Sequence, residues 1–191
     1  MKRLTGRVQP AGDEATRHLP GDELIAQPLA SLTHAITIHT APRAVWPWLA
    51  QMGAGRGGWY SYDRVDNGGQ PSVACVVAEL QQLTPGMIFP AVPGAIDGFT
   101  LASFDPEHSL VLGWRAPDRS WLVTWAFVLH ELHDGSTRLV VRVRGGTGYE
   151  FHGLPWPVAR VVVPVVHFFM QRKQLLGLAA RAEAHSVRRA A

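Results

Sequence analysis

One short segment of the chain gathers most of the residue types that could bind a ligand or do chemistry. Residues 53–67 contain four glycines, followed by the aromatic residues Trp59, Tyr60 and Tyr62 and by two acids, of which Asp63 is the first. Glycines let the backbone turn sharply or approach a ligand, aromatic rings supply stacking surface, and carboxylates accept hydrogen bonds. We therefore expect a ligand site here, with packing and helix capping as the plainer explanation for the two tyrosines and Asp63.

Three residues are candidates for proton transfer. Asp63 could act as an acid or base if burial shifted the pKa of its carboxyl, and the nearby Tyr60 could polarise a carbonyl group. His167 interrupts an apolar run near the C-terminus, where it could be a core histidine with satisfied hydrogen bonds or a polar anchor for a ligand. The sequence leaves the identity of any catalytic residue unknown.

The glycine-rich segment also spells two known binding motifs in a context that does not suit them. Gly53, Gly55 and Gly58 match the dinucleotide-binding pattern, but they follow an expected helix, whereas that motif needs a strand before it. Asp63 and Asp66 could ligate a hard cation, yet acids at a helix edge are more often caps. We expect no metal and no cofactor. Serine-hydrolase elbow, zinc-protease and P-loop motifs do not occur in the sequence.

Length and composition place these residues in one globular domain. The chain has 191 residues, 47% of them hydrophobic, which is enough for a single buried core. The formal charge of +3 is weak evidence for nucleic acid, so we expect no nucleic-acid partner. The single cysteine, Cys75, excludes an intramolecular disulfide, favours a reducing compartment and is expected to be a small buried residue.

Neither the start nor the interior of the sequence has the pattern of a membrane segment. The basic residues of 1–7 are followed by polar residues instead of the apolar core of a signal peptide. The longest apolar run, 161–170, is about half of the roughly 20 residues that a membrane span needs. We expect a cytoplasmic protein without an integral span. Peripheral membrane contact and the oligomeric state stay open.

The hydrophobic pattern predicts the elements that must position the candidate residues. Residues 1–29 are rich in Pro, Gly and charge and are expected to form an N-terminal arm, which leaves a ligand-binding domain over 30–191. Alternation predicts a first strand over 32–39, and helical spacing predicts a helix from about residue 40 to Gly53. Further strands are expected near 99–104, 110–115, 121–131 and 137–144, with shorter ones within 73–90.

A final helix and the longest strand carry apolar faces that must be covered. Apolar residues recur at helical spacing over 158–184, and alternate residues of 121–131 share one face, which suits a filled core and a cavity wall equally. We expect an α+β fold in which a curved antiparallel sheet wraps around the long C-terminal helix. The ligand-lining residues expected from this layout are Trp59, Tyr60, Tyr62, Asp63, Phe99, Trp114, Trp121, Trp125, Phe127, His167 and Met170.

The turn between the last two strands decides which side chains face that helix. A two-residue turn would pair Phe127 with Arg142 and bury an unpaired guanidinium. A three-residue loop with Gly135 in the left-handed conformation pairs Phe127 with Val141 instead. We therefore expect the longer loop, with Arg142 on the outer face together with Arg138 and Arg144.

With the elements in this order, several stretches resemble the SRPBCC superfamily. They are residues 41–53, 57–63, 124–127 and 171–175, and the resemblance spans about Leu32 to Glu183. The superfamily includes START-like, Bet v 1-like and polyketide cyclase/dehydrase-like proteins. The resemblance implies a helix-grip fold with a cavity between the sheet and the final helix. The superfamily has no universal catalytic motif, so no catalytic residue follows from it.

Three functions are compatible with these expectations. The leading hypothesis is binding of a small hydrophobic or aromatic molecule in the cavity between sheet and helix. The alternatives are a polyketide cyclase/dehydrase-like enzyme that uses acid/base residues in that cavity, and a protein or lipid interaction module. Two acid/base groups in one cavity would favour the enzyme, an apolar lining would favour binding, and a filled core with an exposed tryptophan patch would favour the module.

Overall fold

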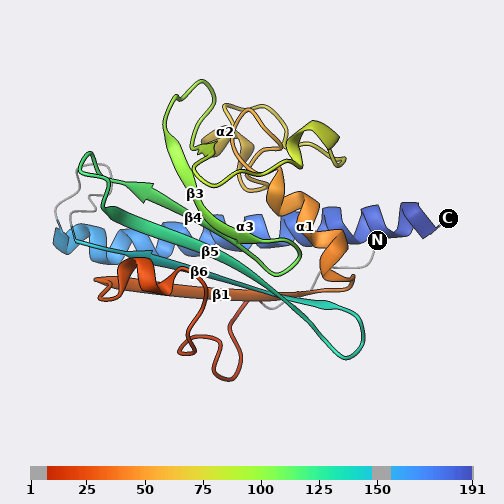
Figure 1. The fold of residues 1–191 in the computed structure, drawn as a ribbon, viewed down its shortest axis with the longest axis horizontal. Helices are drawn as coiled ribbons and strands as arrows, with labels where there is room; N and C mark the ends of the chain where they lie inside the picture. Colours follow the sequence, from red (N-terminus) through yellow and green to blue (C-terminus); the bar gives the residue numbers. More distant parts are fainter. Residues whose placement is uncertain (1–7, 148–155, 191) are drawn as a thin grey trace.

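A six-stranded antiparallel sheet with one long helix along it forms the fold (Figure 1). The computed structural model describes residues 8–147 and 156–190. The strands follow the spatial order β1-β6-β5-β4-β3-β2, and helix α3 (Trp156–Ala190) lies against one face, called here the inner face. This arrangement confirms the expected α+β fold with a helix-grip-like layout. The strands are β1 (Ala30–Ile38), β2 (Ile88–Pro90), β3 (Gly98–Asp105), β4 (Ser109–Arg115), β5 (Trp121–Glu131) and β6 (Thr137–Gly145).

Short helices and loops fill the connection between β1 and β2. Helix α1 (Pro42–Ala50) begins with a proline in its first turn, where the missing N–H costs nothing, and it buries Val45, Trp48 and Leu49 on one side. It ends before the expected Gly53, because that glycine has a φ of 115° and instead pairs with Gly58 in an isolated bridge. The remaining short elements are η1 (Asp22–Ile25), α2 (Asp63–Asp66) and η2 (Ala78–Leu80).

Helix α3 supplies the inner-face layer. It is longer than the expected 158–184, and it continues through Pro164 without ending. Its buried positions Gln171, Gln174, Leu175 and Leu178 recur three or four residues apart, which places them on one side of the helix. This side packs against the buried inner-face residues of the sheet, among them Phe127.

Residues 8–29 cover part of the opposite, outer face. Leu19 packs there with Ala35, Val128 and Val140, which alternate along their strands with inner-face residues. Within the described part of the chain, no helix is long and apolar enough to cross a membrane.

The hairpin between β5 and β6 has the expected three-residue loop. Phe127 lies opposite Val141, and Gly135 has a φ of 76°. Arg142 is therefore on the outer face, but it is only 4% exposed, because residues 8–29 cover it and satisfy its donors. It donates to the Asp22 carboxylate at 2.6 Å, and its other partners are Thr33 Oγ1 and the backbone carbonyls of Glu14 and Arg17. Burial of this guanidinium is tolerated because each of its three nitrogen atoms donates a hydrogen bond and one partner is a carboxylate.

Trp121 does not share the face of Trp125, so this expectation was wrong. The register passes from Trp114 opposite Val123 to Arg115 opposite Trp121, which leaves one extra residue in β5. A bulge of this kind reverses the alternation of side chains beyond it. The Trp121 ring consequently lies over Gly113 on the outer face, with the Arg115 guanidinium 3.7 Å from the ring centroid.

Cys75 also differs from its expectation. It is exposed instead of buried. The carbonyl of Cys75 accepts a hydrogen bond from the Gln51 side chain, so the backbone of this loop is fixed while the thiol faces outward.

Candidate ligand-binding site

Five of the expected ligand-lining residues come together in one aromatic cluster on the inner face. Trp59 stacks on Trp125 with ring centroids 5.4 Å apart and an interplanar angle of 20°. Phe99 meets the Trp125 ring at 5.3 Å and the Trp114 ring at 5.5 Å, and Phe127 lies 5.0 Å from Trp125. Offset and edge-to-face contacts at these distances are favourable aromatic geometries.

The polar groups of this cluster are tied to the surrounding backbone and to α3. Trp59 Nε1 donates to the carbonyl of Pro90 at 3.1 Å. Trp125 Nε1 donates to Gln171 Oε1 at 3.1 Å, and Gln171 Nε2 donates to Gln174 Oε1 at 2.7 Å. Because buried indole N–H groups need partners, the two glutamines fix the position of Trp125 relative to α3.

Burial of the inner face is uneven along the strands. In the row formed by Leu32, Val143 and Trp125, all three side chains are partly exposed. In the next row, Val141 and Phe127 are 1% and 0% exposed. Phe99 and Trp114, next to Trp125, are partly exposed as well. The inner face is therefore closely packed around Phe127 and only partly covered around Trp125, although Leu112, opposite Trp125 on β4, and Val123 are buried there as well.

A pair of histidines lies next to these partly exposed side chains, with His34 in the same row as Val141. His34 of β1 faces His167 of α3 with ring centroids 5.3 Å apart, and Phe168 packs against the His34 ring. The Nδ1 atoms of both histidines are buried without a hydrogen-bond partner in the described structure. Burial, with a smaller contribution from the charge of His34, lowers the pKa of His167 to about 4, and burial also lowers the pKa of His34. Both rings are therefore neutral at pH 7.

Tyr60 and Asp63 do not reach the aromatic cluster. The Tyr60 ring packs edge-on against Trp48 of α1, and the Arg181 guanidinium lies 4.9 Å from its centroid. Burial raises the pKa of the Tyr60 phenol. Asp63 accepts a 2.6 Å hydrogen bond from Ser72, whose hydroxyl oxygen in turn accepts the backbone N–H of Tyr60. These contacts hold the loop together and leave neither group beside the partly exposed side chains around Trp125.

The other expected residues lie apart from the cluster as well. Tyr62 is 44% exposed. Met170 is partly buried on α3, and its carbonyl accepts a hydrogen bond from Ser61. Asp66 is buried with one carboxylate oxygen lacking a partner, and burial, reinforced by the charge of Asp63, raises its pKa to about 6.

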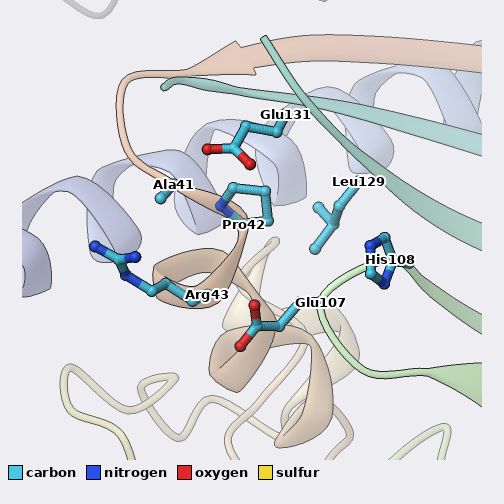
Figure 2. A pocket seen from close by; sticks show the side chains of 7 residues that line it. All are labelled: Ala41, Pro42, Arg43, Glu107, His108, Leu129 and Glu131. Atoms are coloured by element: carbon cyan, nitrogen blue, oxygen red, sulfur yellow. The ribbon is translucent and has the colours of Figure 1, made fainter. Parts of the chain in front are cut away.

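Two surface pockets lie outside the space between the sheet and α3. The first, of about 120 Å³, is lined by Ala41, Pro42, Arg43, Glu107, His108, Leu129 and Glu131. Figure 2 shows its charged side chains on separate elements, and all of them are exposed to solvent. The second, of about 400 Å³, lies on the outer face between residues 15–26 and Arg142 and Arg144. Asp22 pairs with both arginines and Glu23 also lines the pocket, so two carboxylates balance the two cations and weaken any attraction for an anion.

Sequence reasoning missed His34 and Gln171. His34 could have been found, because strand alternation places it on the same face as Ile36 and Ile38. Gln171 lies about one helical turn after His167, so its position on the inner side was also readable from helical spacing. The hydrogen bond from Trp125 to Gln171 could not be predicted, because it joins two segments that are distant in the sequence.

Comparisons with known proteins leave the chain without a family assignment. No family model matches the sequence, and no curated protein matches it significantly. Solved structures with a similar fold include protein CV1439 of Chromobacterium violaceum, with 14% identity, a TM-score of 0.44 and coverage of 80% of this chain and 97% of that one. Protein Ms6760 of Mycobacterium smegmatis has 15% identity, a TM-score of 0.39 and coverage of 81% and 88%. The names of these two proteins state no activity.

Metal binding finds no support in the described residues. Within 8–147 and 156–190, no three His, Cys, Asp or Glu side chains are grouped closely enough to hold a metal ion. The histidine pair and the aromatic cluster are consequently the features on which a function can be argued.

Proposed function

We propose that this protein binds a small hydrophobic or aromatic molecule between the inner face of the sheet and α3, as its resemblance to the SRPBCC superfamily implies. The observation that carries the proposal is the uneven burial of the inner face. Trp114, Trp125 and Leu32 are partly exposed, whereas Phe127 in the next row is fully buried. A group of large apolar side chains left partly exposed beside a packed core is a surface that an apolar ligand can cover.

The energetics of such a site are sufficient for binding without any ionic contact. Burying an aliphatic ligand of about ten carbons contributes on the order of 8 kcal/mol before the costs of association, which allows micromolar affinity. Stacking on Trp114 or Trp125 favours planar ligands further.

The histidine pair suggests that the ligand carries one polar group. A neutral imidazole has one N–H donor and one acceptor nitrogen, and in His34 and His167 the buried Nδ1 atoms lack partners. A hydroxyl or carbonyl group on the ligand would supply the missing hydrogen bond, and its position would set the orientation of the ligand.

A second candidate function is a polyketide cyclase/dehydrase-like reaction. A neutral imidazole beside a bound molecule can accept a proton from it, but the pKa of about 4 makes His167 a weak base, so the histidine pair supports this alternative less than it supports binding. In this alternative His167 is the base, while Tyr60 and Asp63 stay in their structural contacts.

Native mass spectrometry of gently purified protein, with a matched pair of tryptophan variants, tests the binding proposal. We expect a co-purifying apolar molecule in the wild type. Trp114→Ala should weaken the binding of a hydrophobic dye about tenfold, because it removes one aromatic wall of the site. Trp121→Ala is the control, since this tryptophan lies on the outer face at the other side of the same bulge. Equal dye affinity of the two folded variants would contradict the proposed location of the site.

A further inference from the structure

Helix α3 carries an exposed apolar face that lies mostly on the side away from the sheet, and only Phe168, at its edge, also packs against the His34 ring of β1. Val165, Val166, Phe168 and Phe169 are 53%, 36%, 39% and 56% exposed. They precede Gln171 and Gln174, which are both 2% exposed and face the sheet. Four neighbouring apolar side chains open to solvent on one helix are unusual for a surface that contacts only water.

Positive charge adjoins this apolar face. Arg172 and Lys173 are exposed and lie three to five residues after Phe168 and Phe169, which is about one helical turn. The sequence from 156 to 182 contains no Asp or Glu, so no acid on this part of α3 neutralises them. We call Val165, Val166, Phe168, Phe169, Arg172 and Lys173 together the α3 docking face.

We propose that the α3 docking face binds the surface of an anionic lipid bilayer. An apolar face bordered by cations is the pattern of helices that lie in the membrane interface, where the apolar side chains enter the acyl boundary and the cations meet lipid phosphates. From Val165 onward α3 is a regular helix without a further proline, so its backbone groups bond within the helix and only side chains need to enter the bilayer.

The size and charge of this face favour a bilayer over a second copy of the chain. The exposed fractions correspond to on the order of 300 Å² of apolar surface, whereas a standard stable interface buries roughly 800 Å² per partner. A symmetric dimer through this face would also bring Arg172 and Lys173 of both copies together. Anionic lipids remove that repulsion and add attraction.

The orientation follows from the packing of α3. The helix would lie along the bilayer surface, with the sheet on the side away from the lipid, because the sheet covers the opposite side of the helix (Figure 1). The inference does not depend on ligand binding between sheet and helix.

Co-sedimentation with lipid vesicles tests the proposal on the full chain. We expect the wild type to bind vesicles that contain phosphatidylglycerol, and to bind pure phosphatidylcholine vesicles much more weakly. Phe169→Ser should weaken binding about tenfold through loss of buried apolar area. Replacing Arg172 and Lys173 by Gln should weaken binding about twenty-five-fold, at about fivefold per cation, and reduce its salt dependence.

Matched controls separate this face from general surface properties. Ile96→Ser removes an apolar side chain that is 99% exposed on a loop, and Arg43→Gln removes an exposed cation on α1. Both should leave vesicle binding unchanged. Trp114→Ala should also leave it unchanged, so failure of the ligand proposal and failure of this one are distinguishable.

Three results would overturn the inference. They are no binding to anionic vesicles, an equal loss in the control variants, and a concentration-dependent dimer in sedimentation velocity that Phe169→Ser abolishes. The last result would identify a second copy of the chain as the occupant. Val165→Ser provides a second variant of the face in case Phe169→Ser does not fold.

Discussion

Two titratable groups, the buried Asp66 and the partly buried His167, should make the stability of this protein depend on pH in opposite directions. Burial and the neighbouring charge of Asp63 raise the pKa of Asp66 to about 6, above its ordinary value of 3.8. Stability from this group is therefore present below pH 3.8 and is lost as the pH rises through about 6. Burial and His34 lower the pKa of His167 from 6.5 to about 4, so stability from this group is present above pH 6.5 and is lost as the pH falls towards 4.

The two contributions have similar size. Each pKa unit corresponds to about 1.4 kcal/mol, so protonation of His167 costs about 3 kcal/mol of unfolding free energy between pH 7 and pH 4. Ionisation of Asp66 costs about 2 kcal/mol between pH 4 and pH 7. In the native sequence these slopes largely cancel, and single variants should reveal them.

Urea unfolding at about pH 4 and pH 7 measures both slopes. Relative to the wild type, Asp66→Asn should gain about 2 kcal/mol of stability from pH 4 to pH 7, because asparagine cannot acquire the buried charge. His167→Leu should gain about 3 kcal/mol relative to the wild type from pH 7 to pH 4. Differences that stay constant within ~0.5 kcal/mol over this range would refute the assignment of these groups as buried and pKa-shifted.

Two further variants probe the packing of the loops. Gly177→Ala should destabilise the protein by about 1–3 kcal/mol, measured as a fall in Tm. Alanine normally stabilises a helix interior, but here the added Cβ would lie 2.3 Å from the Tyr60 carbonyl oxygen. A Tm at or above that of the wild type would contradict this close contact. Asp22→Asn should cost about 3–5 kcal/mol in urea unfolding, because it leaves the buried Arg142 without its carboxylate. Asp118→Asn, at an exposed aspartate, is the control. An equal loss of unfolding free energy in both variants would show that the buried pair stabilises the protein no more than a surface aspartate does.

Most of the fold could be predicted because burial and periodicity act locally. The strand Trp121–Glu131 has the bounds that alternation gave. The register of Phe127 with Val141 followed from the cost of burying an unpaired arginine. The face of Trp121 could not be predicted, since the bulge depends on how two strands pair over their length. The burial of Arg142 beneath residues 8–29 also depends on contacts between distant segments.

The candidate site was predicted in part for the same reason. Trp125 and Phe127 were placed correctly on one face by alternation, and Trp59, which stacks on Trp125, was placed near them. The sequence could not show that the neighbouring Tyr60 points away from the cluster that Trp59 joins. Its φ of 60° is rare for a residue other than glycine, and only the packing around it imposes that conformation.

The glycine-rich segment therefore has a different role from the one its composition suggests. A Cβ on Gly57 would lie 2.7 Å from the Gln51 carbonyl oxygen, and one on Gly58 would lie 2.3 Å from Ser72 Oγ. These glycines are needed for close backbone packing. That packing, with the left-handed turn at Tyr60, directs Trp59 onto Trp125 and directs the Tyr60 ring towards α1 and α3. The segment fixes one wall of the aromatic cluster, and under the binding proposal the ligand would cover the partly exposed side chains around Trp125.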